Sequence, residues 1–145
     1  MKRIIVLIAG WILCAAMGSA FGQEPKPYKE GPVINVSYIK IKPGKFDDYI
    51  KFLDTSYKSL MEAEKKAGLI LDYAVFTKES RNPQEADLIL TTTYANMAAL
   101  DRSDEFEAVA NKVVGTNDTQ NKAMIGREPM REVLGSELIR QLLLK

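Results

Sequence analysis

The residue types that most often carry out chemistry are scarce in this sequence. Its 145 residues include no histidine, the side chain whose unperturbed pKa lies near neutrality and which most often binds metals. The one cysteine, Cys14, lies in an apolar segment near the N-terminus. No phosphate-binding glycine loop and no paired carboxylates at helical spacing are present. We therefore expect neither a metal site nor a bound cofactor, and no catalytic residue can be assigned.

A small group of polar side chains lies instead in segments that are predicted to be strands. These candidate ligand-binding residues are Asn35, Ser37, Asp72, Thr91 and Thr93. Hydrogen-bonding groups of this kind in an apolar surround fix the orientation of a small molecule. The alternative is structural, because Ser and Thr also pair across sheets or hold buried water. Asp72 has two interpretations as well: a buried acid or base with a raised pKa, or an exposed carboxylate in a salt bridge.

Two strands and one long helix are predicted in the first half of the chain. Residues 33–41 are rich in the β-branched and aromatic side chains that favour strands, and Lys42-Pro43-Gly44 ends this strand. From residue 46 to residue 66, apolar side chains recur every three or four residues, which predicts an amphipathic helix. Gly68 is placed to end that helix, and residues 69–77 form the next predicted strand.

The second half of the chain predicts the remaining elements. Residues 87–94 form a strand that pairs with residues 69–77 as a hairpin across a long turn. A second helix follows, with Ser103 as its N-cap, and a short helix is expected at residues 119–125. Residues 136–144 suit either a helix or a strand, and periodicity alone does not decide between them.

Alternation along the strands assigns side chains to the two faces of the sheet. Asn35 and Ser37 share one row of the first strand, and Thr91 and Thr93 share one row of the third. The opposite rows are more apolar and contain Ile34, Val36, Tyr38, Leu88, Leu90 and Tyr94. We expect the more apolar rows to pack against the helices, and the four polar residues to face away from them with Asp72 nearby.

The predicted order of elements is that of the ferredoxin-like βαββαβ unit, an α+β fold with a four-stranded antiparallel sheet. The sheet closes only if residues 136–144 are the fourth strand. The passage from the first strand through Lys42-Pro43-Gly44-Lys45-Phe46 into an amphipathic helix resembles the dimeric α+β barrel superfamily, over residues 33–144. That superfamily includes antibiotic-biosynthesis-type monooxygenases, haem-degrading monooxygenases and NIPSNAP-type domains. The resemblance implies a homodimer in which two sheets face each other.

A haem site does not follow from this resemblance. Haem-degrading members of the superfamily use an Asn, a Trp and a His in their pockets. Here only Asn35 is a candidate counterpart, because the chain has no histidine and its one tryptophan, Trp11, lies in the N-terminal segment. We therefore expect a member of this fold without haem.

The N-terminal segment has the pattern of a secretory signal peptide. Lys2 and Arg3 precede an apolar run that ends in small residues, which predicts a signal peptide at residues 1–22 and a periplasmic or secreted protein. Residues 23–32 contain three prolines and are predicted to be a flexible leader to one domain at residues 33–145. Cleavage would leave no cysteine, no stable membrane anchor and a net charge of −1. That charge gives no reason to expect nucleic acid binding.

Different classes of function remain open from the sequence. The first is an exported homodimer that binds a small molecule or acts as an accessory protein, without metal or haem. The alternative is a cofactor-independent monooxygenase or isomerase-like enzyme that mainly positions a small aromatic or quinone-type substrate. A domain that serves only protein interactions is a third alternative, and a tightly filled barrel interior would be its sign.

Overall fold

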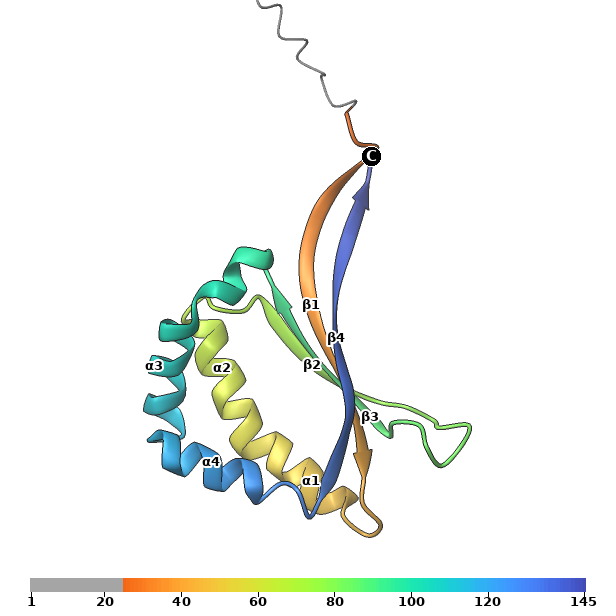
Figure 1. The fold of residues 1–145 in the computed structure, drawn as a ribbon, viewed down its shortest axis with the longest axis vertical. Helices are drawn as coiled ribbons and strands as arrows, with labels where there is room; N and C mark the ends of the chain where they lie inside the picture. Colours follow the sequence, from red (N-terminus) through yellow and green to blue (C-terminus); the bar gives the residue numbers. More distant parts are fainter. Residues whose placement is uncertain (1–24) are drawn as a thin grey trace, which may run out of the picture.

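The computed structural model describes residues 25–145, which form a four-stranded sheet with the helices on one side (Figure 1). The strands are β1 (Tyr28–Ile41), β2 (Asp72–Thr77), β3 (Leu88–Tyr94) and β4 (Arg131–Leu144). The helices are α1 (Phe46–Phe52), α2 (Lys58–Lys66), α3 (Ser103–Val113) and α4 (Asn117–Ile125). A π-helical turn, Leu53–Tyr57, joins α1 to α2, and a 3-10 helix, Met97–Asp101, precedes α3. The predicted signal peptide at residues 1–22 lies outside the described residues.

The sheet has the order β2-β3-β1-β4, and every neighbouring pair is antiparallel. This topology confirms the predicted ferredoxin-like α+β fold. The closing segment is a strand, because β4 pairs along β1 from Ile41 opposite Arg131 to Tyr28 opposite Leu144. That pairing joins opposite ends of the chain, so local periodicity does not report it.

The first strand begins earlier than the sequence predicted. Residues 28–32, which the prediction assigned to a flexible leader, belong to β1, and Tyr28, Lys29 and Glu30 pair with the last residues of β4. The pairing register shifts between Glu30 and Val33, where Gly31 and Pro32 break the strand pattern. The leader prediction is therefore wrong for residues 28–32, because the long fourth strand pairs with residues that have little strand preference of their own.

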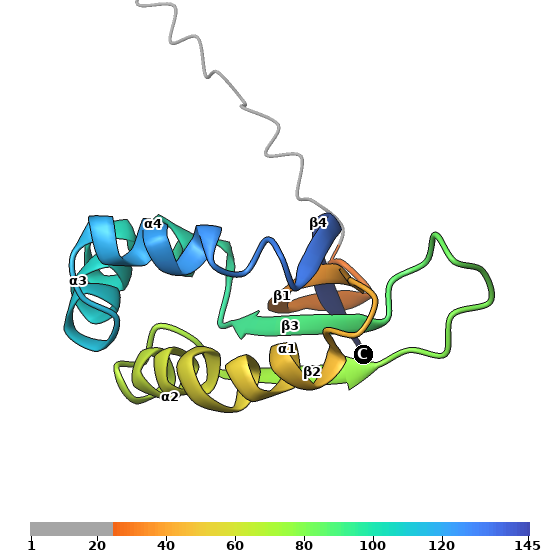
Figure 2. The same cartoon turned by 90° about the horizontal axis from the view of Figure 1, so that it is seen from below.

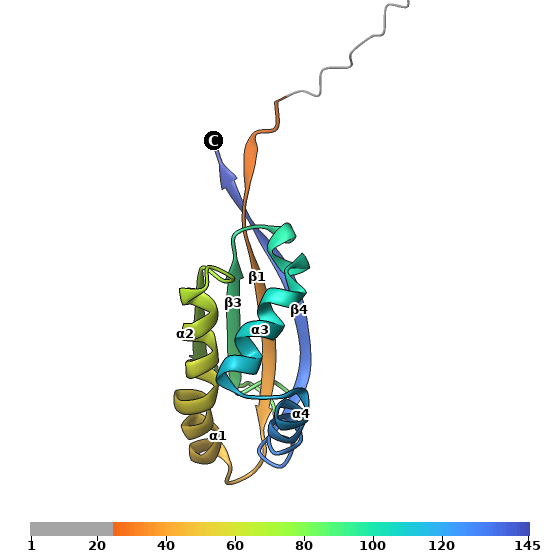
Figure 3. The same ribbon diagram turned by 90° about the vertical axis from the view of Figure 1, so that its left-hand side faces the viewer.

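The core lies between the sheet and the helices, which stand in front of it in Figure 3. Ile39 and Leu88 of the sheet pack against Tyr49 and Leu53 of the first helical segment. A second cluster lies under α2 and α3 and consists of Met61, Leu69 and Ile70, with Tyr94, Phe106 and Val109 beside it. None of the helices at residues 25–145 is long and apolar enough to span a bilayer.

The strand register defines two faces of the sheet. Asn35 lies opposite Thr92 and Ser37 opposite Leu90, so these residues share the helix face with Ile39 and the core. We call the other side the open face, since none of the helices in Figures 1 and 3 covers it within the described range. Its rows contain Ile34, Val36, Tyr38, Asp72, Ala74, Phe76, Ile89, Thr91, Thr93, Glu137 and Ile139.

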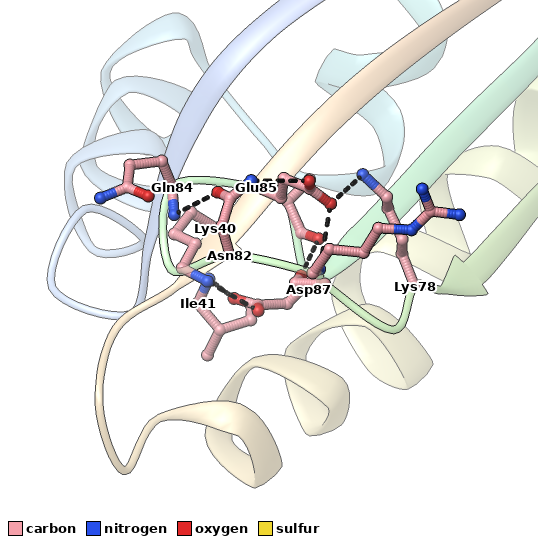
Figure 4. A network of polar contacts seen from close by, with 10 residues as sticks. Lys40, Ile41, Lys78, Asn82, Gln84, Glu85 and Asp87 are labelled. Atoms are coloured by element: carbon pink, nitrogen blue, oxygen red, sulfur yellow. Dashed lines mark hydrogen bonds and ion pairs between the residues drawn. The ribbon is translucent and has the colours of Figure 1, made fainter.

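The loop between β2 and β3 projects away from the helices (Figure 2) and is held by polar contacts (Figure 4). The carboxylate of Asp87 accepts hydrogen bonds from Lys40 Nζ at 2.9 Å and from the backbone N–H of Ile41 at 2.7 Å. Lys78 and Glu85 form an ion pair at 2.8 Å within the loop. These contacts fix the loop to the end of β1.

Candidate ligand-binding site

A cavity of about 250 Å³ lies on the helix face, near the sheet edge formed by β4. Its floor is made by side chains of three strands, Ser37, Leu90 and Ser136. The first helix and the π-helical turn supply an aromatic wall of Tyr49, Phe52 and Tyr57. The remaining side is closed by Arg127 and Arg131, from the connection between α4 and β4. The cavity therefore combines a few polar groups with an apolar lining, as ligand pockets do.

Two serine hydroxyls meet on the cavity floor. Ser37 of β1 and Ser136 of β4 lie directly opposite each other in the antiparallel register, so their Oγ atoms are 2.9 Å apart. One hydroxyl donates to the other, which leaves one O–H free to donate to a third group. Ser136 is exposed, so the cavity opens at the β4 edge.

The tyrosines of the wall are protonated hydrogen-bond donors at neutral pH. Burial raises the pKa of Tyr57 to about 12. Burial also raises the pKa of Tyr49, although Arg131 and Arg127 oppose the shift. Tyr57 ends the π-helical turn, whose wider winding shifts the phase of the helix at this point. Turns of this kind occur often at functional sites.

The arginines carry positive charge that no carboxylate of residues 25–145 neutralises through an ion pair. The Arg127 guanidinium lies 5.3 Å from the ring centre of Phe52, and that of Arg131 lies 5.8 Å from the ring centre of Tyr49. Arg127 Nε donates to the carbonyl of Ala123 at 3.2 Å. Arg131 Nε is buried and has no hydrogen-bond partner among the described residues. Burial and the neighbouring Arg131 both lower the pKa of Arg127.

Two further cavities adjoin the first. One of about 150 Å³ shares Phe52, Tyr57 and Arg127 and continues between the helices over an apolar lining. The other, of about 460 Å³, shares Arg131 and Val133 and lies outside the arginines. The arginines thus stand where an apolar interior meets a wider outer recess.

The predicted site residues do not come together. Ser37 lines the cavity, and Asn35 lies on the same face two residues along β1. Thr91 and Thr93 lie on the open face, opposite to the prediction that these four residues share one side. The prediction failed because it compared rows strand by strand. Asn35 and Ser37 belong to the same row as Val33 and Ile39, the two most buried side chains of β1. Because Val33 and Ile39 are buried, this row packs against the helices.

Asp72 is an exposed carboxylate rather than a buried acid or base. Its side chain is 66% exposed and forms an ion pair with Lys65 Nζ at 2.8 Å. The hydrogen bond from Lys65 lowers the pKa of Asp72, so this carboxylate is ionised at neutral pH. Of the two interpretations, the structure supports the salt bridge.

Sequence reasoning missed the arginines and the aromatic wall. Tyr49 and Tyr57 fit the apolar face of a helix, so their hydroxyls gave no separate signal. Arg127 and Arg131 flank Pro129 at a spacing of four residues in a segment that mixes turn formers with short apolar pieces. Two like charges that bracket a turn are a weak signal, and only the folded connection brings them to the cavity.

Comparisons with known proteins concern the fold. No protein-family model and no curated protein matches the chain. A dimeric ferredoxin-like protein from an uncultured marine organism aligns at 11% identity and a TM-score of 0.51, over 81% of this chain and 98% of that one. Protein SO0527 from Shewanella oneidensis aligns at 18% identity and a TM-score of 0.50, over 80% and 98%. A NIPSNAP family protein from Agrobacterium tumefaciens aligns at 13% identity and a TM-score of 0.48, over 79% and 89%.

The first two of these structures are matched over nearly their whole length by four-fifths of this chain. The chain therefore has the ferredoxin-like α+β fold.

Proposed function

We propose that this protein is a homodimer that binds a small molecule in the cavity between its sheet and its helices. The observation that carries this proposal is the cavity itself, where the paired hydroxyls of Ser37 and Ser136 face an apolar and aromatic lining. Its volume of about 250 Å³ lies just below the usual range of ligand pockets, so the ligand is about one ring in size.

Binding is better supported than the catalytic alternative. The hydroxyls of Tyr49 and Tyr57 keep their protons at neutral pH, since burial raises the pKa of both. They therefore suit hydrogen bonding to a ligand rather than proton abstraction. Asp72, which the sequence suggested as an acid or base, is exposed and paired with Lys65.

The dimer is the second part of the proposal. The aligned marine protein is a dimeric ferredoxin-like protein, and the open face of this chain displays apolar side chains such as Phe76 and Ile139 to solvent. A sheet with helices on only one side needs a second layer to cover its other side. A second copy of the chain supplies that layer in our proposal.

Export to the periplasm or the medium is proposed from the N-terminal sequence. The Lys2-Arg3 start, the apolar run and the small residues before Gln23 support it. Mass spectrometry of protein expressed from the full-length chain in a bacterium should give a mature species that begins near Gln23. A species that retains residues 1–22 would contradict export by a cleaved signal.

The binding proposal is tested by NMR screening of one-ring compounds against the mature chain, residues 23–145. We expect hits that shift the amides of Ser37 and Ser136. Ser136→Leu should abolish these shifts because its side chain fills the cavity. Ser136→Ala leaves the space open, so the shifts should remain. Thr91→Leu is the control on the open face. Hits that survive Ser136→Leu and disappear in Thr91→Leu would move the site to the other side of the sheet.

A further inference from the structure

The charge of the cavity points to the class of its ligand. We propose that the ligand is a small organic anion, whose charged group is held by Arg127 and Arg131 and whose apolar body lies against Phe52 and Leu90. This inference rests on the proposed function, because it assigns a ligand class to the same cavity.

The backbone holds both arginines at the cavity. The N–H groups of Met130 and Arg131 donate to the carbonyl of Arg127 at 3.0 and 3.2 Å, so the turn between the arginines is closed. The N–H of Lys42 donates to the carbonyl of Met130 at 3.0 Å and attaches the turn to the end of β1. The backbone at both arginines is therefore fixed by hydrogen bonds of the fold.

Their positive charge is left without compensation by the described part of the chain. Glu128 and Glu132 line the outer recess together with Arg131, yet neither forms an ion pair with an arginine of the cavity there. Two like charges near each other in a half-buried site are unfavourable without a counter-charge. Burial first, and the neighbouring charge of Arg131 second, lower the pKa of Arg127. An anion between the guanidinium groups would relieve the repulsion.

The donors of the site suit a planar or tetrahedral oxyanion. A guanidinium presents a fixed fork of N–H donors, which matches a carboxylate or phosphate better than an ammonium does. Arg131 Nε has an unused N–H, and the serine pair on the floor offers one more O–H. The aromatic faces of Phe52 and Tyr49 already contact the guanidinium groups. A ring of the ligand beside them would pack against the same apolar surface. The shared chemistry is an oxyanion on a small apolar body.

The test uses matched acid and amide pairs with the mature chain at neutral pH. Benzoate with benzamide and phenylacetate with phenylacetamide have nearly equal shapes and differ in charge. Inorganic phosphate is the anion that lacks an apolar body. Dissociation constants follow from NMR titration of the Ser37 and Ser136 amides. We expect an acid to bind at least about tenfold more tightly than its amide, as the loss of a hydrogen bond to a charged group implies.

Variants separate charge from shape. Arg131→Gln and Arg127→Gln should each weaken binding of the acid about tenfold or more and leave the amide unchanged. Arg131→Lys keeps the charge but loses the fork, so an intermediate affinity is expected. Arg81→Gln, in the β2–β3 loop, is the matched control and should bind like the wild type. Circular dichroism confirms that each variant is folded.

The outcomes distinguish this inference from the proposed function. Equal affinity for acids and amides, with shifts confined to the cavity, would overturn the anion inference and leave the small-molecule site intact. Phosphate that binds as tightly as the organic acids would also overturn it, because the apolar body would contribute nothing. If no acid or amide shifts a cavity residue at millimolar concentration, both proposals fail.

Discussion

At the scale of single residues, Glu64 of α2 is the one buried charged residue among residues 25–145. It is 7% exposed beside the apolar cluster of Met61 and Leu69. Burial raises its pKa to about 7 from an ordinary value of 4.5. The native state therefore keeps a proton that the unfolded chain has already lost between these two pH values.

The first prediction concerns Glu64→Gln. Since the folded-state pKa is raised, stability that is present below about pH 4.5 is lost as pH rises towards 7. Above pH 7 the wild type carries the full cost of a buried charge. Glu64→Gln removes that cost and should raise the free energy of unfolding at pH 8 by up to about 3 kcal/mol, with little effect near pH 4. Urea titrations at both pH values measure it, with the exposed Glu79→Gln as control. An equal effect at both pH values would contradict the raised pKa.

The residues of the candidate site differ in how far sequence could predict them. Ser37 was a candidate from the sequence, but for the side of the sheet away from the helices, whereas the cavity that it lines is on the helix face. Its partner Ser136 depends on the register between β1 and β4, which joins residues 99 positions apart. Arg127 and Arg131 reach the cavity only once the turn beyond α4 has closed onto β1. A contact between residues so far apart in the chain leaves no pattern in the local sequence.

At the scale of elements, helix periodicity was the strongest predictor. Residues 46–66 are helical as predicted, but with a π-helical turn at Leu53–Tyr57 that a repeat of 3.6 residues does not reveal. The fourth strand was ambiguous in sequence, and pairing with β1 decided it. The face of the sheet that meets the helices was predicted wrongly for Asn35 and Ser37. The burial of neighbouring side chains settles that choice.

The second prediction concerns the C-terminal end of α2. Gly68 has a φ of +68°, and the N–H groups of Gly68 and Leu69 donate to the carbonyls of Lys65 and Glu64, each at 3.0 Å. A Cβ at Gly68 would meet no atom within 4 Å, so the cost of Gly68→Ala is the left-handed backbone alone. We expect a loss of about 1 kcal/mol in the free energy of unfolding.

The control for Gly68→Ala is Gly135→Ala in β4. A Cβ at Gly135 would likewise meet no atom within 4 Å, but the backbone of Gly135 lacks the left-handed φ. Its substitution should leave stability unchanged or raise it slightly, because alanine restricts the unfolded chain. Losses of equal size at both positions in denaturant titrations would show that the backbone conformation of Gly68 is not the cause.

The third prediction concerns the loop between β2 and β3. Partial burial opposes ionisation of Asp87, but hydrogen bonds from Lys40 and from the backbone of Ile41 prevail and lower its pKa. Asp87→Asn should therefore cost about 1 to 2 kcal/mol at pH 7. Because the folded-state pKa is depressed, this contribution is present above about pH 4 and disappears as pH falls further. Thermal unfolding of wild type and variant from pH 7 down to pH 2 measures the difference, and a difference that does not shrink as pH falls below 4 would contradict it.

At the scale of the whole molecule, the two faces of the sheet differ in what covers them. The helix face contains the core and the cavity, and so most buried side chains belong to it. The open face has apolar side chains and also a polar pair, in which the Tyr38 hydroxyl donates to Glu137 at 2.6 Å. The proposed ligand site and the proposed dimer contact therefore lie on opposite sides of the sheet, so each can be tested by substitutions that leave the other side unchanged.

The last prediction is that the mature chain is a dimer joined through the open face. Phe76 and Ile139 are 51% and 46% exposed on two different strands of that face, although large apolar side chains favour burial. A stable interface of standard size buries about 800 Å² on each partner. Light scattering after gel filtration at micromolar concentration should give the mass of two chains.

Phe76→Glu combined with Ile139→Glu should give a folded monomer, because association would then bury two carboxylates on each partner without counter-charges. The matched control is Met97→Glu, at a side chain that is 44% exposed but lies in the 3-10 helix outside the sheet. That variant should remain a dimer.

A wild type with the mass of a single chain would contradict the dimer. A dimer that survives the double substitution would instead place the contact elsewhere, with the exposed Leu142 and Leu144 at the end of β4 as the next surface to substitute.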